Sequence, residues 1–254
     1  VAVAVGFLSG AAMFGAISFV PLFAQGGLGA TATQAGTLLT PLMLSWVLMS
    51  IVGGRLMLRT GYRPLVLIGL TIMPAGFFVL STFGRGTPLR ALIPVLAAIG
   101  AGLGLVMLTL LIAVQHSVVR ERLGIATSLN QFSRSLGGAV GVAIMGTMLS
   151  AGLAAAAGAG AGAIDPGAVI DPVTRADLDP EQLLRLEGAL VESLQGVFRV
   201  SGALAVIALL VALTLPRDTH NAPAAEASEG ERMVMAEMTT IDPEHEPCCG
   251  EEET

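Results

Sequence analysis

A cationic turn, Gly53-Gly-Arg-Leu-Met-Leu-Arg-Thr-Gly-Tyr-Arg-Pro-Leu-Val-Leu67, separates two long apolar runs of this chain and decides its fold. Neither residues 1–54 nor residues 64–84 contain a charged side chain. A helix needs about 20 apolar residues to cross the hydrocarbon core of a bilayer, which is about 30 Å thick. The charged side chains of the turn are Arg55, Arg59 and Arg63. Because arginine is enriched in cytoplasmic loops, the pattern predicts two membrane spans joined on the cytoplasmic side.

The composition of the whole chain is that of an integral membrane protein. Of its 254 residues, 54% are hydrophobic and only 13% are charged, and the mean hydropathy is +0.78. Soluble domains carry about 25% charged residues, so the composition argues against that class. The net charge of -6 says nothing about nucleic acid, because the first acid is Glu121 and the others follow from Asp165 onward, in a loop and a tail. No nucleic-acid partner is expected.

The cationic turn resembles the signature loop of the major facilitator superfamily. The matching residues are Gly54, Leu56, Arg59, Gly61, Arg63 and Leu67. Leu58 stands where the family usually has Asp and Tyr62 where it has Arg, so the charge-relay role of that Asp is not carried over. A degenerate copy of this kind is typical of the second half of these transporters. The open alternative is that any membrane protein can place three arginines in a cytoplasmic turn.

The hydropathy pattern predicts an all-α membrane protein with six transmembrane helices, which form a half-bundle over residues 1–216. The spans are expected over about residues 1–25, 35–54, 64–83, 91–115, 135–157 and 197–215. An outer loop with a surface helix is expected over 165–194, where Asp179-Pro180-Glu181-Gln182 has the composition of a helix start. Residues 217–254 are expected to form a disordered, acidic cytoplasmic tail.

A second resemblance lies in the stretch from Gly124 to Gly146, which includes Asn130-Gln-Phe-Ser-Arg134. It is similar to the cytoplasmic approach and fifth helix of the second six-helix unit in fourteen-span drug/proton antiporters. The endings 21–25 and 110–115 are similar to the same branch. The resemblance implies the C-terminal half of such a major facilitator transporter. Because the chain opens on Val1 inside an apolar run, we expect an N-terminally truncated fragment that lacks its N-terminal half.

The function implied by the resemblance is proton-coupled efflux of lipophilic or cationic drugs by alternating access. The expected location is the cell membrane, with several spans and a cytoplasmic C-terminus, and no enzymatic activity is expected. Proton coupling needs a carboxylate inside the membrane. None occurs in the six predicted spans, so this group is expected in the missing half. Two alternatives stay open, namely a carrier of a specific polar metabolite within the same superfamily and a non-transporting six-helix scaffold.

Polar residues in the predicted spans are candidates for a substrate cavity or gate. They are Gln25, Thr40, Trp46, Thr109, Gln115, Gln131 and Arg134, with Thr37, Ser50 and Asn130 as further candidates. A Thr or Ser in such a helix can equally bond the carbonyl one turn back, a Trp can pack, and Arg134 can reach toward the head groups. Small residues spaced by four are expected to pack helices closely. These pairs are Gly6 and Gly10, Gly100 and Gly104, and Gly137 and Gly141.

No cofactor and no metal site are expected. His245, Cys248 and Cys249 could bind a soft metal, but two solvated thiols in a tail are the favoured interpretation. The expected partners are the lipid bilayer, the missing half of the transporter, a drug-like small molecule and protons.

Overall fold

The computed structural model describes residues 1–116, 118–157 and 180–214, and every element in them is helical. The elements are α1 (Ala2–Leu22) with a π-helical turn (Phe23–Gly27), α2 (Ala32–Thr37), α3 (Leu39–Thr60), α4 (Tyr62–Leu80), α5 (Leu89–His116), a 3-10 turn (Arg120–Arg122), α6 (Leu123–Ala157) and α8 (Pro180–Leu213). Six helices in the described ranges are long and apolar enough to cross a membrane. This confirms the predicted all-α half-bundle, whereas the predicted tail lies outside the described residues.

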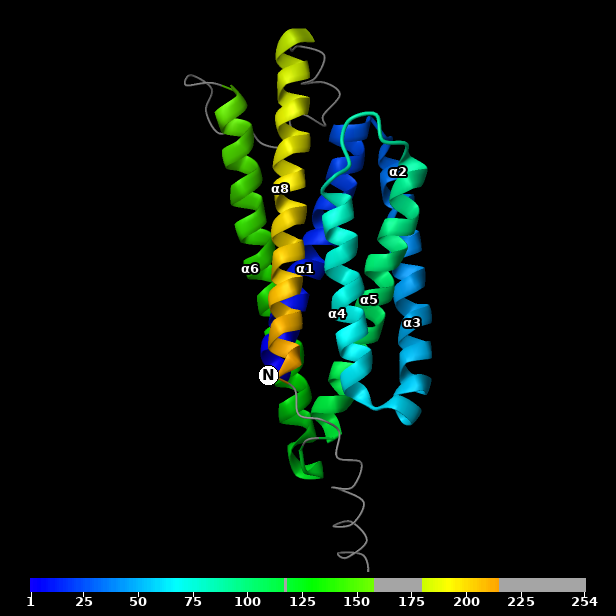
Figure 1. Cartoon of the computed structure of the whole chain (residues 1–254). Coiled ribbons are helices and arrows are strands. Elements are labelled where there is room, and N and C mark those ends of the chain that lie inside the picture. Colours follow the sequence, from blue (N-terminus) through cyan, green and yellow to red (C-terminus); the bar gives the residue numbers. More distant parts are fainter. Residues whose placement is uncertain (117, 158–179, 215–254) are drawn as a thin grey trace, which may run out of the picture. The chain divides into compact units, whose positions relative to one another are not determined.

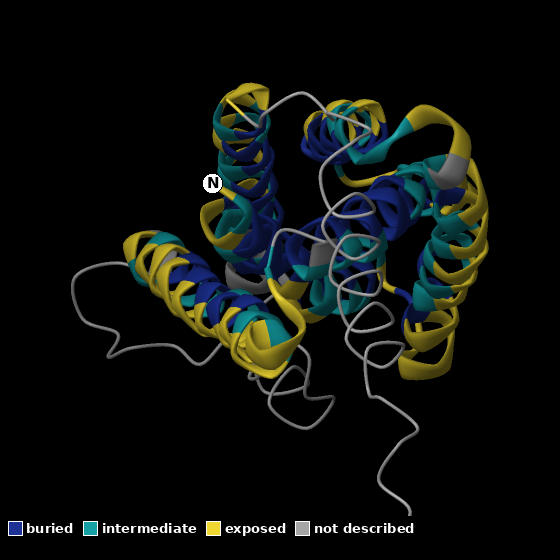
Figure 2. Cartoon of the chain, turned by 90° about the horizontal axis from the view of Figure 1, so that it is seen from below, coloured by how far each residue is buried: buried dark blue, intermediate teal, exposed yellow. Residues whose placement is uncertain are grey.

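The long helices run side by side, with α1 and α5 at the centre (Figure 1). Helix α6 packs along α1, α3 packs along α5, and α4 and α8 pack against each other and against the central pair. Seen from one end, buried residues line the inner sides of the helices and exposed residues lie on the outer sides of the bundle (Figure 2). The bundle core therefore lies between the central pair and α4 and α8, and α3 and α6 are left at its edges.

The cationic turn joins α3 to α4 at one end of the bundle (Figure 1). Gly61 ends α3 with a φ of 78°, a conformation that favours glycine, and its N–H bonds the carbonyl of Met57 at 3.0 Å. Arg63 Nη2 donates to the carbonyl of Leu213 at 3.0 Å, so the start of α4 is tied to the end of α8. The α5–α6 connection lies at the same end, which we call the arginine end.

Two helices begin earlier than the sequence analysis expected. Helix α6 begins at Leu123, and not after Arg134 as expected for the span 135–157. The uncharged residues before Arg134 continue the helix because several of them pack against α1. Helix α8 is continuous over 34 residues, so no separate surface helix precedes residue 197 in the described part of the chain.

The expected surface helix differs because its apolar residues are used inside the bundle. Leu186, Leu190 and Leu194 are buried in the same core cluster as Phe23 and Phe198, whose rings meet edge to face at 5.6 Å. A helix with this stripe gains more from packing on its neighbours than from lying at a lipid surface. The part of the expected surface helix that spans 165–179 lies outside the described residues.

Close backbone contact joins α3 to α5. A Cβ atom on Gly104 would collide with the carbonyl oxygen of Trp46, and one on Gly100 would collide with the carbonyl oxygen of Leu42. Ser50 adds a hydrogen bond from its Oγ to the carbonyl of Gly104 at 3.3 Å. The two glycines, one turn apart, let the helix backbones touch.

A second close contact joins α1 to α6. A Cβ atom on Gly10 would collide with the carbonyl oxygen of Arg134, and one on Gly6 would lie 3.0 Å from Asn130 Oδ1. On the other side of this contact, a Cβ atom on Gly137 would collide with the carbonyl oxygen of Phe7. The helices are therefore fixed by glycine on both partners.

These two contacts are related by an internal repeat. The α5 glycines lie 94 positions after the α1 glycines (Gly6 to Gly100, Gly10 to Gly104), and the α6 residues lie 88 positions after those of α3 (Leu42 to Asn130, Trp46 to Arg134). The contact of Gly53 with Leu105 and that of Gly141 with Ala11 obey the same two offsets. One three-helix unit consists of α1, α3 and α4, and the other consists of α5, α6 and α8. Because α1 and α5 are antiparallel, the two units form an inverted repeat, in which Arg134 takes the place of Trp46.

The repeat also marks the middle of the bundle. A Cβ atom on Gly6 of α1 would lie 3.9 Å from the Leu110 side chain of α5, so these residues are at one level. Five residues further inward on both helices lie Ala11 and Leu105, which are equivalent in the repeat. Residues that are both level and equivalent lie at the centre of an inverted repeat. Gly10 is one residue, about 1.5 Å along the helix, from this centre.

Candidate functional site

Along the helix axes, Arg134 lies near the middle of the bundle and not at either end. Its backbone contacts Gly10, and it follows the first residue of α6 by 11 positions, a distance of about 17 Å along the helix. Its side chain is partly buried, with Nη1 3.2 Å from Met107 Sδ of α5 and Nη2 hydrogen-bonded to Gln131 Oε1. The structure thus places a guanidinium group deep within a membrane-spanning helix.

Among the described residues, the carboxylates lie in the turn before α6 and in the first half of α8. Residues 1–120 and 123–157 contain no Asp or Glu, and Glu121 lies in the turn before α6. The longer α8 adds Glu181, Glu187 and Glu192 to the described helices, where the sequence analysis expected no acid within the spans. All three glutamates precede Gln195, whose side chain bonds the carbonyl of Phe83 at 2.8 Å in the loop that follows α4. They therefore lie at the end opposite the arginine end.

Thr109 and Trp46 of the predicted cavity set lie in helix contacts. Thr109 is 1% exposed, its Oγ1 has no hydrogen-bond partner, and it lies 3.9 Å from a Cβ atom placed on Gly53 of α3. Trp46 is partly buried and packs against the core cluster. Both side chains face neighbouring helices of this bundle. The contacts of Trp46 are those of a side chain that packs helices together, which was the alternative to a cavity residue.

The other predicted cavity residues are spread along the bundle. Gln25 is partly buried in the π-helical turn after α1, and Thr40 is exposed in the first turn of α3. Gln115 is partly buried near the C-terminal end of α5, at the arginine end of the bundle. Among the seven residues of that set, a side-chain hydrogen bond joins Gln131 and Arg134 within the part of the chain that the structure describes.

Two polar residues of α6 link it to α1, and one of them was missed in the sequence. Ser133 Oγ donates to the carbonyl of Val3 at 2.8 Å, although no motif singled this serine out. Asn130 is 8% exposed, and its Oδ1 has no hydrogen-bond partner in the described structure. The spacing of Asn130, Ser133 and Gly137 on one helix face was the available signal.

We expect Ser133→Ala to weaken the α1–α6 contact modestly. The change removes one interhelical hydrogen bond, and such bonds average about 0.6 kcal/mol in membrane proteins. Thermal unfolding of the purified protein in detergent measures the effect. Ser128→Ala, at an exposed position of the same helix, is the control and is expected to leave the midpoint unchanged. Equal midpoints for the two variants would contradict the contact.

The signature loop residues hold the arginine end together, and of the three loop arginines only Arg63 is partly buried. A Cβ atom on Gly54 would lie 3.2 Å from the Leu108 side chain, so Gly54 allows α3 and α5 to approach. Arg55 and Arg59 are exposed at the end of α3, and Arg63 bonds the end of α8. The arrangement presents arginines to the surroundings and fixes the turn by backbone contacts.

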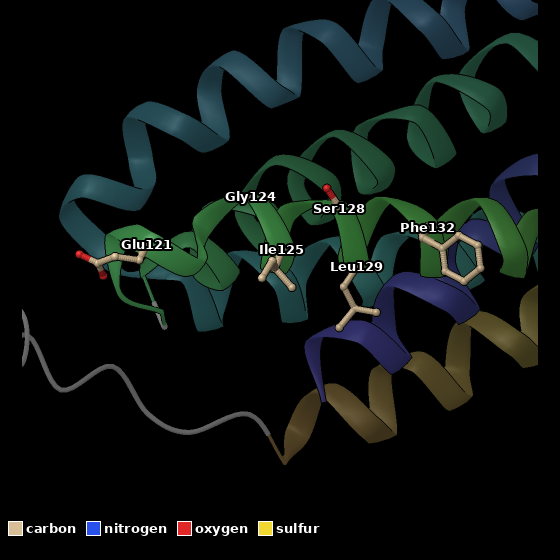
Figure 3. A pocket seen from close by; sticks show the side chains of 6 residues that line it. All are labelled: Glu121, Gly124, Ile125, Ser128, Leu129 and Phe132. Atoms are coloured by element: carbon tan, nitrogen blue, oxygen red, sulfur yellow. The ribbon is translucent and has the colours of Figure 1, made fainter.

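An open pocket of about 600 Å³ lies on the first turns of α6, at the arginine end. It is lined by Glu121, Gly124, Ile125, Ser128, Leu129 and Phe132. Figure 3 shows Ile125, Leu129 and Phe132 projecting from the same helix, with Glu121 at its start. The sequence analysis named Glu121 and the segment that begins at Gly124, but it did not predict that these residues line a pocket. The pocket continues into a wider exposed surface of α6.

The two edge helices carry exposed apolar faces. On α6 the exposed side chains are Ile125, Leu129, Phe132, Leu136, Val140, Ile144 and Met148, and on α3 they are Leu44, Val47, Leu48, Ile51, Val52 and Leu56. Such faces need lipid or another apolar partner, because water would make them costly. The site described here is therefore a half-bundle with a guanidinium at mid-depth and two uncovered apolar edges.

Comparison with known proteins identifies the family. Residues 1–142 match the family model described as Major Facilitator Superfamily. The chain belongs to this superfamily. The predicted resemblance to it is confirmed. With six potential membrane-spanning helices, the chain is a multi-pass membrane protein.

Relatives in the superfamily are longer than this chain. It is 42% identical over 147 residues to the Multidrug transporter protein MdtP of Bacillus subtilis (strain 168), which covers 58% of this chain and 27% of that protein. It is 30% identical over 149 residues to the Tetracycline resistance determinant of Streptomyces rimosus, with 58% and 43% covered. It is 30% identical over 205 residues to Multidrug resistance protein 3 of Bacillus subtilis (strain 168), with 76% and 40% covered. The chain thus spans less than half the length of these relatives.

Proposed function

We propose that this chain acts as the second, C-terminal six-helix half of a fourteen-span drug/proton antiporter in the cell membrane. In this proposal the complete transporter exports lipophilic or cationic drugs by alternating access. The observation that carries it is the 42% identity, over 147 residues of the half-bundle, to a protein named as a multidrug transporter. The names of the other two relatives agree with drug resistance.

The complementary N-terminal half of the transporter is proposed from the surface of this chain. Major facilitator transporters consist of two six-helix halves that rock around a central site. The apolar faces of α3 and α6 are uncovered in this chain, and the matched relatives are more than twice as long as the segments they share with it. A complementary six-helix half fits both observations.

Proton coupling is proposed to use a carboxylate of the complementary half. A proton carrier must reach the middle of the membrane, and intramembrane carboxylates serve this role in pumps and transporters. The described helices α1–α6 contain no such group, and Glu181, Glu187 and Glu192 lie in the first half of α8. This chain then contributes the cavity wall and the gate. The proposed gate residues are Arg134 and Gln131. The proposed wall residues, which become exposed to the cavity during the transport cycle, are Gln25, Thr40, Trp46, Thr109 and Gln115.

We expect cells that produce the complete gene product to accumulate several-fold less ethidium, a lipophilic cation, than cells that carry the empty vector. Collapse of the proton gradient with a protonophore should abolish the difference, because export against a gradient then lacks its driving force. Fluorescence of intracellular ethidium measures both states. Equal accumulation in the two strains before the protonophore is added would refute drug efflux, and a difference that survives it would refute proton coupling.

A further inference from the structure

The side chain of Arg134 is not needed for the helix contact at its position. The contact with α1 is made by the carbonyl oxygen of Arg134 against Gly10. In the equivalent contact of the internal repeat, the carbonyl oxygen of Trp46 meets Gly104. The nearest atom in both contacts is a backbone carbonyl oxygen, and the part of the Arg134 side chain that also approaches Gly10 is the uncharged Cγ, at 2.9 Å from the placed Cβ. An uncharged side chain serves at the equivalent place. The guanidinium therefore needs an explanation other than packing.

The present partners of the guanidinium are neutral. Nη2 bonds the amide oxygen of Gln131, and Nη1 meets the thioether sulfur of Met107, which is a weak acceptor. A charged side chain at the middle of a membrane is costly unless it is paired, and it marks a substrate or ion pathway by default. In the described helices the carboxylates lie at the ends of the bundle, so the compensating charge must come from elsewhere.

We infer that Arg134 and Gln131 bind a carboxylate group at the middle of the transporter. The planar guanidinium matches a carboxylate with two parallel hydrogen bonds, and the amide of Gln131 offers a further N–H donor beside it. Gln131 is exposed and Arg134 only partly buried in this half-bundle, so a partner can reach both. The inference deepens the proposed function, because it gives the mid-membrane site a ligand chemistry.

The carboxylate has two possible sources that share this chemistry. It belongs either to the substrate, which would then be an apolar molecule with a carboxylate, or to a side chain of the complementary half. In the first case Arg134 sets substrate class and favours zwitterions and anions over permanent cations. In the second case it holds the two halves together while the acid is ionised.

The first experiment measures binding to the purified, complete gene product. The probes are rhodamine 110, which carries a free carboxylate, and rhodamine 123, its methyl ester. If the substrate supplies the carboxylate, the protein should bind rhodamine 110 about tenfold more tightly, as expected for a hydrogen bond to a charged group. Arg134→Gln should abolish this preference, and Arg134→Lys should weaken it because lysine lacks the planar fork. Arg90→Gln, at an exposed arginine near the start of α5, is the matched control and should keep the preference.

The second experiment measures thermal stability between about pH 7 and pH 3, because a carboxylate paired with a guanidinium keeps its charge down to about pH 4. If the complementary half supplies the carboxylate, the rhodamine preference is absent. The wild-type midpoint should then fall as the pH approaches 3, because protonation breaks the pair, and the midpoint of Arg134→Gln should fall less. If Arg134→Gln does not fold, the Arg134→Lys variant gives both readouts, and a carboxylate site predicts that at least one of them changes.

The inference is overturned if the Arg134 variants change neither the rhodamine preference nor the pH dependence of stability. Neither readout requires transport. A protein that exports nothing but shows an Arg134-dependent carboxylate preference would refute the proposed function and keep the site. A protein that exports ethidium and shows neither effect would keep the proposed function and refute the carboxylate site.

Discussion

Gly137→Ala is expected to destabilise the bundle strongly, while Gly146→Ala on the same helix leaves it intact. A Cβ atom on Gly137 would collide with the carbonyl oxygen of Phe7 and would lie 2.7 Å from its carbonyl carbon and 2.9 Å from its Cα atom. All three atoms belong to the backbone of α1, so no side-chain rotation can relieve the overlap. Helices α1 and α6 must move apart. Overpacking of this kind costs about 1–3 kcal/mol, and occasionally more.

Gly146 is the matched control because it lies in the same helix with open space around it. Apart from its chain neighbours and the adjoining backbone of α6 itself, no atom lies within 4 Å of a Cβ placed there. Alanine favours a helix over glycine by about 1 kcal/mol, so Gly146→Ala should keep or raise stability. Thermal unfolding and size-exclusion chromatography of the complete protein in detergent measure both variants. A Gly137→Ala protein as stable as Gly146→Ala would show that the α1–α6 contact differs from the one described.

The internal repeat extends this expectation to the other edge of the bundle. Gly104 of α5 meets the carbonyl oxygen of Trp46 as Gly10 of α1 meets that of Arg134. The two glycines should therefore show similar losses on replacement by alanine. Their side-chain partners differ in charge, which is why the repeat is hard to see in the sequence and plain in the contacts.

The six long apolar helices were predictable because lipid imposes a length on apolar segments. The cationic turn gave the α3–α4 junction, and the turn glycine at residue 61 has the positive φ that a helix end of this kind needs. The glycine pairs were predictable as close-packing positions from their spacing alone. The partner helix of each pair was not, since spacing on one helix does not identify its neighbour.

The start of α6 could not be predicted because a charge was taken as the edge of a span. Arg134 follows a polar segment that contains Asn130 and Ser133, which has the composition of a cytoplasmic approach. In the structure these polar side chains face α1, and the helix continues through them. A charge at mid-depth and a charge at a head group look alike when polar residues precede both. The depth of Arg134 follows only from its contact with Gly10.

The orientation of individual polar side chains was equally hidden from the sequence. Thr109 lies in the central helix α5, which is apolar on almost every side, so no stripe in the sequence tells which face meets a cavity. The structure turns its hydroxyl toward α3. The open pocket at the start of α6 escaped notice for a related reason, because the exposure of its six lining residues depends on where neighbouring helices end.

A cysteine at Thr60 is expected to be shielded from an impermeant maleimide in intact cells, and a cysteine at Thr82 is expected to react fully. The two threonines are matched, since both are exposed and both donate to a carbonyl of the preceding turn, at 3.0 Å to Leu56 and at 2.7 Å to Val79. They differ in the end of the bundle on which they lie. Thr60→Cys and Thr82→Cys are made in a background in which the tail cysteines are replaced by serine.

The expected side of each cysteine follows from the arginines. The arginine end carries five of them in the two connections and the adjoining helix ends, namely Arg55, Arg59, Arg63, Arg120 and Arg122. Each arginine near an anionic cytoplasmic leaflet contributes about 1 kcal/mol of attraction, and short arginine-rich loops are retained on that side. At the opposite end, the loop after α4 and the adjoining first turn of α5 carry two arginines, Arg85 and Arg90. Permeabilised cells should label Thr60→Cys as strongly as Thr82→Cys, because both sites are then reachable. Labelling of Thr60→Cys in intact cells would show that the bundle has the opposite orientation in the membrane. The proposed direction of drug export would then lose its structural basis.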